Sequence, residues 1–389
     1  MLRQNYEAGK AYTINVEVAD AFISNANLIE KAGLSSCEMF FGQVDAWVYR
    51  DLILEVKELD LSNLNDSTVC DEIGFFRNLE TLRCNNNQLT YLDVSNNPKL
   101  TFLNCNSNQL TSLDVSNNPA LTDLYCISNE LTSLDVSKNP ELTDLYCNTN
   151  QLTSLDVSNN PALTDLYCYS NQLTSLNVSN NPALTDLSCY SNQLTSLDVS
   201  NNTALENFKC FGNQLTSLDL SNNMALSLVS CQGNLLDSLI VTDHPSLKSL
   251  YVGNSGFKKL DCHGNALTTL SVYNQGSIVD LNCSNNALES LSNVRYYSAL
   301  KSLECKNNQL TSLTVPTSLT NLQCSYNLMS SLDITKCNDL TKSNVLCGAQ
   351  YTSKNKTEHQ TLTLYARSAD TSPLYYTGTE NYQVTVVNQ

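Results

Sequence analysis

The sequence predicts a right-handed solenoid of stacked parallel strands, in the mainly β or α/β class. A 21-residue segment recurs with small changes from Leu79 to about Leu340. Within each copy, apolar residues alternate in two short halves, as on strands that bury one face. Asn-Gln or Asn-Asn-Pro follows each half and turns the chain. Because one copy cannot bury its apolar row alone, the copies are expected to stack around a continuous core.

Each copy has two halves with the same apolar spacing. In the copy that begins at Leu163, the key positions of the two halves are Leu163, Leu166, Cys168 and Asn171, then Leu173, Leu176, Val178 and Asn181. The Cys position recurs every 21 residues, at Cys84, Cys105, Cys126, Cys147, Cys168, Cys189, Cys210 and Cys231. A strict repeat of this length is the signature of leucine-rich repeats. The two rows of Asn are expected to satisfy backbone groups at the bends.

These units resemble the irregular 21-residue leucine-rich repeats of bacterial surface proteins that are related to the internalin type. The resemblance covers about two-thirds of the chain. It implies a module that binds a protein or a glycan at the cell surface. The start, MLRQNYEAGKAYT, has no signal-peptide core, so the protein is either cytoplasmic or has had an export signal removed, and the resemblance favours the second. We therefore expect a secreted or cell-surface protein.

Three regions follow from the repeat pattern. Residues 1–55 do not fit the repeat and predict a partly helical N-terminal cap. Relatives often carry an acidic calcium loop before the first repeat, but residues 43–50 lack the alternating Asp and Asn ligands. The leucine-rich repeat solenoid is expected over residues 56–340. A C-terminal β cap is expected over residues 341–389, where residues 361–366 and 382–387 alternate as strands.

The repeat is interrupted after Cys231, where the next cysteine of this kind, Cys262, comes 31 residues later. The inserted residues, 247–256, are themselves a half-unit. One possible outcome is a single enlarged coil. The other is that the two halves exchange sides, which moves the Cys row to the opposite sheet. The near-equal lengths and shared Leu spacing of the halves favour the exchange.

The chain has 16 cysteines, and repeat position explains most of them. Twelve occupy one buried position, the last four being Cys262, Cys283, Cys305 and Cys324. Stacked at the strand spacing of ~4.8 Å with parallel Cβ bonds, they suit neither a disulfide nor a convergent zinc site. They are expected to be free thiols in the core. Cys37, Cys70, Cys337 and Cys347 lie outside this row and are the better candidates for a bridge.

The candidate binding residues lie between the apolar positions of the Cys half, where side chains point outward. Three outward columns there change from coil to coil and are rich in Asp and Tyr. We predict a binding surface made by Asp123, Tyr125, Asp144, Tyr146, Asp165, Tyr167, Tyr169, Asp186, Tyr190 and Phe211. Tyrosine provides a large rigid apolar ring with a hydroxyl, which suits recognition. The alternative is that the Tyr columns only stabilise neighbouring strands.

The remaining composition narrows the function. The formal net charge of −17 argues against nucleic acid or an anionic membrane as partner, and no apolar run has membrane-spanning length. No catalytic motif is found, so we expect no enzyme, no cofactor and no metal site. The partner is expected to be a protein or a glycan, and the chain a monomer. Two alternatives stay open: a structural spacer without a ligand, and a calcium-binding solenoid that uses the repeated Asp114, Asp135 and Asp156.

Overall fold

The structure is a computed structural model that describes residues 54–68, 70, 72–254, 256–273, 276–368, 370 and 384–389. The chain forms two compact units, Met1–Leu173 and Thr174–Gln389. The predicted N-terminal cap, the segment 43–50 and Cys37 lie outside the described residues, apart from residues 54 and 55.

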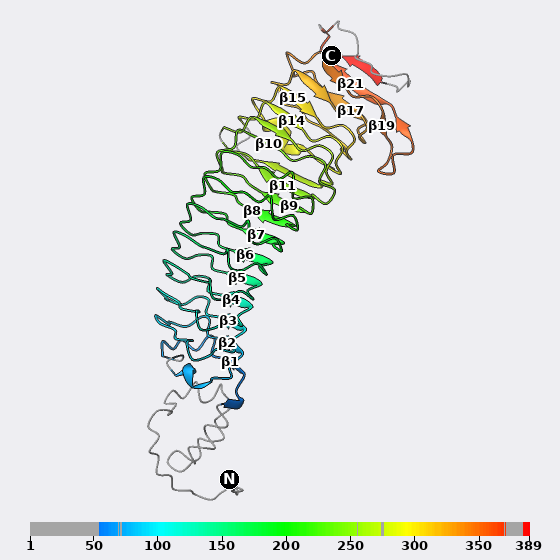
Figure 1. The fold of residues 1–389 in the computed structure, drawn as a ribbon. Coiled ribbons are helices and arrows are strands. Elements are labelled where there is room, and N and C mark those ends of the chain that lie inside the picture. The colour runs from blue at the N-terminus through cyan, green and yellow to red at the C-terminus, as the bar shows by residue number, and fades with distance from the viewer. Residues whose placement is uncertain are drawn as a thin grey trace, which may run out of the picture. The chain divides into compact units, whose positions relative to one another are not determined.

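The first unit is a stack of short parallel strands, one for each coil (Figure 1). They are β1 (Glu58–Asp60), β2 (Thr81–Arg83), β3 (Phe102–Asn104), β4 (Asp123–Tyr125), β5 (Asp144–Tyr146) and β6 (Asp165–Tyr167). Each strand pairs with the next without a slip, so that Leu103, Leu124 and Leu145 lie in line and are fully buried. A 3-10 helix, η2 (Ile73–Phe75), lies in the coil between β1 and β2.

The two Asn rows predicted at the bends bind backbone groups of their own and the preceding coil. The side-chain nitrogen of Asn150 donates to the carbonyls of Cys126 and Cys147 at 2.9 and 3.0 Å. Its oxygen accepts the backbone N–H of Leu131 at 3.0 Å. In the second row, Asn139 donates to the carbonyls of Val115 and Asn118. Buried backbone groups at each bend thereby find partners, which is why Asn recurs.

The second unit contains two parallel sheets of this kind. The first consists of β7 (Asp186–Ser188), β8 (Asn207–Lys209), β9 (Leu228–Ser230), β11 (Ser249–Val252) and β13 (Thr269–Val272). The second consists of β10 (Ser238–Ile240), β12 (Lys259–Asp261), β14 (Asp280–Asn282), β15 (Ser302–Glu304), β16 (Asn321–Gln323) and β18 (Val345–Leu346). The chain is therefore mainly β.

The strand order shows that the two halves exchange sheets after Cys231. β11 pairs with β9, which places Val252 beside Cys231 in the first sheet. β12 pairs with β10 in the second sheet, which places Cys262 beside Val241. The exchange predicted from the inserted half-unit is confirmed. From Cys262 onward the thiols of the row lie along the second sheet, after β12, β14, β15 and β16.

One expectation about the cysteines is wrong: Cys347 belongs to the row. β16 pairs with β18 in a register that sets Cys347 beside Cys324. Gln350 takes the place of the Asn that follows each Cys of the row by three residues in the other coils. Its side-chain nitrogen donates to the carbonyls of Cys324 and Cys347, and its side-chain oxygen accepts the N–H of Met329. The row is hidden in the sequence because this last coil is longer than 21 residues and ends in Gln. All fifteen cysteines of the described residues are free and buried.

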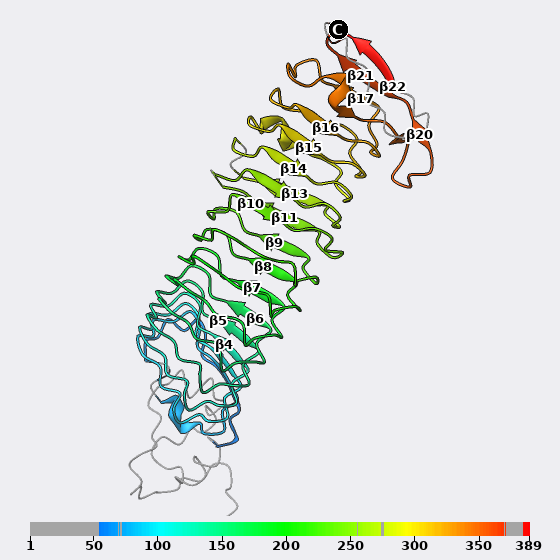
Figure 2. The same cartoon turned by 45° about the horizontal axis from the view of Figure 1, so that its top comes forward.

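The C-terminal strands lie next to one another at the end of the second unit (Figure 2). β17 (Ser331–Asp333), β21 (Leu362–Ala366) and β22 (Val384–Asn388) form a parallel sheet. β19 (Gln350–Tyr351) pairs antiparallel with β20 (His359–Gln360). Two further 3-10 helices are η3 (Ser292–Tyr296) and η4 (Lys342–Asn344). Strands β21 and β22 match the two alternating segments that the sequence indicates.

Candidate functional site

A stack of aromatic rings crosses the outer face of β3 to β6 in the first unit. The rings of Tyr125 and Tyr146 have centroids 4.6 Å apart, and those of Tyr146 and Tyr167 are 4.4 Å apart and nearly parallel. Phe102 meets Tyr125 edge-on at 5.2 Å, and the Arg83 guanidinium lies 4.8 Å from the Phe102 ring centre. Strand register brings these rings together, because each follows the buried Leu of its own strand or precedes it. The ring faces therefore contact one another, and the column offers its edges to solvent.

A row of carboxylates runs beside the aromatic stack. Register sets Asp123, Asp144 and Asp165 in line on β4, β5 and β6. The hydroxyl of the preceding Thr donates to each of them, at 2.7, 2.8 and 2.9 Å from Thr122, Thr143 and Thr164. Partial burial first, and then the charges of Asp123 and Asp165, raise the pKa of Asp144, against the hydrogen bond from Thr143. The row thus concentrates negative charge on a half-buried surface.

The Tyr125 hydroxyl is linked to this acidic row. It donates to Asp123 Oδ1 at 3.4 Å. Burial first, and then the charges of Asp123 and Asp144, raise the pKa of Tyr125. The hydroxyl is accordingly protonated across the physiological range and acts as a donor. Rings and carboxylates form one acidic, aromatic surface.

The third outward column contains a buried polar group that sequence reasoning did not single out. Asn148 is only 1% exposed, and its side-chain oxygen has no hydrogen-bond partner. Its nitrogen donates to Thr149 Oγ1 at 3.4 Å. Asn148 follows the inward Cys147 and lies two residues beyond the end of β5 at Tyr146. Tyr169 is its register neighbour in the next coil, where its carbonyl accepts the N–H of Thr149.

The ten predicted binding residues divide between the two units. The first unit contains Asp123, Tyr125, Asp144, Tyr146, Asp165, Tyr167 and Tyr169, and the structure brings the first six into two adjoining rows. The second unit contains the other three. There, Tyr190 and Phe211 stack with centroids 4.2 Å apart, and Ser188 Oγ donates to Asp186 Oδ1 at 3.5 Å. The Thr residues that hold the carboxylates were missed, although the recurring Leu-Thr-Asp triplet is visible in the sequence.

The Asp row of the other half has a structural role. The backbone N–H groups of Ser116, Ser137 and Ser158 each donate at 2.9 Å to the Asp two residues earlier. Hydrogen bonds from the Ser hydroxyl and backbone N–H lower the pKa of Asp114 and likewise that of Asp156. These carboxylates close local turns. Among the described residues, no three His, Cys, Asp or Glu side chains are grouped to hold a metal ion.

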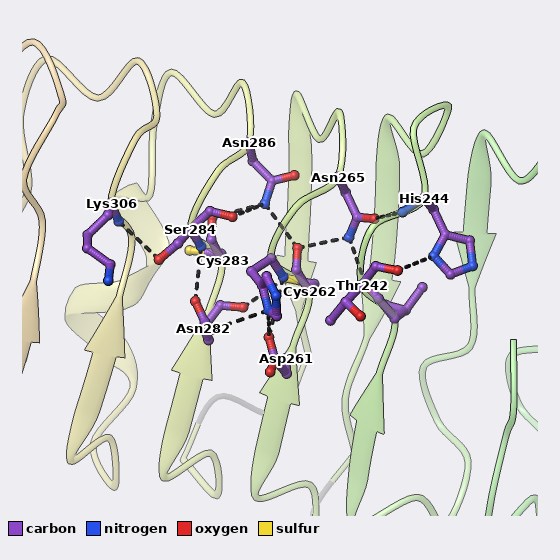
Figure 3. Close-up of polar contacts among 12 residues, drawn as sticks. Thr242, His244, Asp261, Cys262, Asn265, Asn282, Cys283, Ser284, Asn286 and Lys306 are labelled. Atoms are coloured by element: carbon purple, nitrogen blue, oxygen red, sulfur yellow. Dashed lines mark hydrogen bonds and ion pairs between the residues drawn. The ribbon is translucent and has the colours of Figure 1, made fainter. Parts of the chain in front are cut away.

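A smaller polar cluster lies on the second sheet of the second unit (Figure 3). His263 Nδ1 lies 2.6 Å from Asp261 Oδ1, and Asn282 Nδ2 lies 3.5 Å from the same nitrogen. The hydrogen bond to Asp261 raises the pKa of His263. Cys262 between them is fully buried, as its repeat position indicates. His244 occupies a position of the second Asn row, 21 residues after Asn223. Its ring nitrogens contact the carbonyls of Thr242 and Leu220.

No family model matches the chain, and the comparison with curated proteins found no match. Among solved structures, it is similar to the functional domain of InlJ from Listeria monocytogenes, which includes a cysteine ladder, at 29% identity and a TM-score of 0.46 over 81% of this chain and 76% of that one. It is also similar to a leucine-rich repeat protein of Leptospira interrogans, at 22% identity and a TM-score of 0.49 over 82% and 92% of the two chains.

A third similar structure is the internalin InlF from Listeria monocytogenes, at 22% identity and a TM-score of 0.49 over 83% of this chain and 94% of that one. The described residues contain no helix long and apolar enough to cross a membrane. Three features of the chain itself assign the fold: its 21-residue period, the register of its buried Leu residues and its two Asn rows. Each of its two units is a leucine-rich repeat solenoid.

Proposed function

We propose that this chain is a non-catalytic, extracellular recognition module that binds a protein through the outer face of β3 to β6. The observation that supports this best is the adjacency of the stacked rings of Tyr125, Tyr146 and Tyr167 to the carboxylate row. Rigid aromatic side chains lose little entropy on binding, and the carboxylates add specificity. A module of this kind needs no enclosed pocket.

The ring geometry favours a protein over a glycan. Sugars that bind aromatic side chains typically lie flat on a ring face. Here the faces of Tyr125, Tyr146 and Tyr167 are used in contacts with one another. The ring edges remain as the contact surface, and they suit the amides and charged groups of a protein. A glycan and the absence of any ligand are then outcomes that the experiment can distinguish.

The test uses arrays of purified extracellular proteins and of glycans, probed with the labelled chain. The variant Tyr146→Ser/Tyr167→Ser removes the centre of the surface, and Tyr91→Ser is the matched control, since Tyr91 is exposed and belongs to the other half of its coil. We expect defined protein spots that the control retains and the double variant loses. Binding to glycan spots alone would contradict a protein partner. Binding to neither array would favour a spacer.

A further inference from the structure

The charged side chains on the outer surface of β4 to β6 are all acidic. Its three outward columns, from Phe102 to Tyr169, contain carboxylates, tyrosines, asparagines, one Phe and one Ile, with no Lys or Arg. Asp144 lies between two like charges, which oppose its ionisation. A cation at this row would relieve that repulsion. The complementary partner segment is therefore basic.

The spacing of the carboxylates limits the conformation of that segment. Neighbouring strands are ~4.8 Å apart, so that Asp123 and Asp165, two coils apart, are separated by about 9.6 Å. A polyproline II helix has three residues per turn and rises about 9.3 Å per turn. Every third side chain of such a helix points the same way at almost this spacing. A β-strand laid along the same row repeats its side chains every ~6.7 Å, which matches neither one coil nor two.

On these grounds, and on the premise of the proposed function, we propose that the partner segment is a polyproline II stretch with Lys or Arg at every third residue. It crosses β4, β5 and β6 so that successive basic side chains reach Asp123 and Asp165. Its backbone carbonyls have no internal hydrogen bonds and face the positive edges of the stacked rings. The backbone carbonyls of an α-helix already accept hydrogen bonds within the helix, so that a helical segment gains no such contact with the ring edges.

The test measures the binding of labelled peptides to the full chain by fluorescence anisotropy near physiological salt. One peptide is Lys-Pro-Pro repeated five times, and the second has the same composition with its lysines in a single block. A third is an alanine-rich helical peptide with the same number of lysines. We expect the periodic peptide to bind about fivefold more tightly than either of the others, a ratio that two added surface ion pairs would give.

Two matched variants locate the effect. Asp123→Asn/Asp165→Asn should abolish the preference for the periodic peptide. Asp114→Asn/Asp156→Asn removes the same charge at the same coil spacing from the other half, and it should leave the preference intact. Asn is compatible with that control position, because Asn177 occupies it in another coil and accepts the N–H of Ser179 at 3.0 Å. Both variants keep an oxygen acceptor.

Each outcome either supports or overturns the inference. Equal affinity for all three peptides, or equal loss in both variants, would show simple attraction to a chain of net charge −17 and would overturn it. If no peptide binds while the tyrosine variant loses defined protein spots, the proposed function stands and the basic polyproline segment is wrong. If the arrays stay blank and peptides fail to discriminate, both are wrong.

Discussion

Tyr146 and Tyr167 lie with ring centroids 4.4 Å apart and planes only 6° from parallel. The pair is a direct consequence of the register of β5 and β6, because both rings follow the central Leu of their strands. Strand pairing thus fixes the aromatic column before any partner is present. A preorganised surface of this kind loses little further entropy on binding.

The stack also makes a measurable contribution to stability. Tyr146 stacks on both Tyr125 and Tyr167, and aromatic pairs contribute ~0.5–1.5 kcal/mol each beyond area burial. Tyr146→Ser should lower the free energy of unfolding by about 1–3 kcal/mol, whereas Tyr146→Phe keeps the ring contacts and should cost less. Urea unfolding measures both. Tyr91→Ser is the control, since Tyr91 is 66% exposed. If Tyr146→Ser costs no more than this control, the rings do not stabilise the coils.

The two Asn rows predict different costs of truncation. Asn150→Ala leaves the N–H of Leu131 and the carbonyls of Cys126 and Cys147 without these hydrogen-bond partners. It should lower the free energy of unfolding by about 3–5 kcal/mol. Asn139 makes only its two donor bonds, because its side-chain oxygen has no partner. Asn139→Ala should therefore cost less, about 1–3 kcal/mol. Urea unfolding, together with amide exchange in the affected coils, measures the difference. Equal costs would contradict the assigned bonds.

The sequence predicts the buried positions of each coil well, because these positions recur in every copy of the repeat. Period and alternation are enough to place Leu145, Cys147 and Asn150, and the inserted half-unit is enough to predict the exchange of sheets after Cys231. The repeat does not predict a residue's place where the length of the repeat changes. For this reason the sequence placed Cys347 outside the row.

The outward face is less predictable from the repeat. Its columns identify which side chains share a face, but they do not show how those side chains pack. The burial of Asn148 and the direct contact of the tyrosine ring faces depend on neighbouring coils in three dimensions. Such contacts become visible only when the side chains are placed.

The Asp261–His263 pair predicts a pH dependence of stability. Asp261 raises the pKa of His263 above its ordinary value of 6.5, with Asp243 and Glu304 adding to the effect and burial opposing it. The stabilisation is therefore complete below the unfolded pKa of about 6.5 and is lost as pH rises through the higher folded pKa. The His263 side chain is 36% exposed, so that solvent screening keeps the effect small.

Melting temperatures of the wild type and of Asp261→Asn measure this effect at about pH 5.5 and about pH 9. The difference between the two proteins should be larger at the lower pH. Asp280→Asn, one coil further along the same sheet, changes the same charge without that hydrogen bond and is the control. A difference that grows at the higher pH would have the wrong sign for this pair.

The buried thiols should be chemically silent in the folded chain. Burial raises the pKa of both Cys147 and Cys189 to about 12, and the thiolate is the form that reacts. At about pH 8 their thiolate fraction is roughly three orders of magnitude below that of an ordinary cysteine. In a Cys37→Ser background, Ellman's reagent should therefore leave the native thiols unmodified over the time in which urea-unfolded protein reacts completely. Rapid labelling of Cys147 in the native protein, located by mass spectrometry, would show that this coil opens.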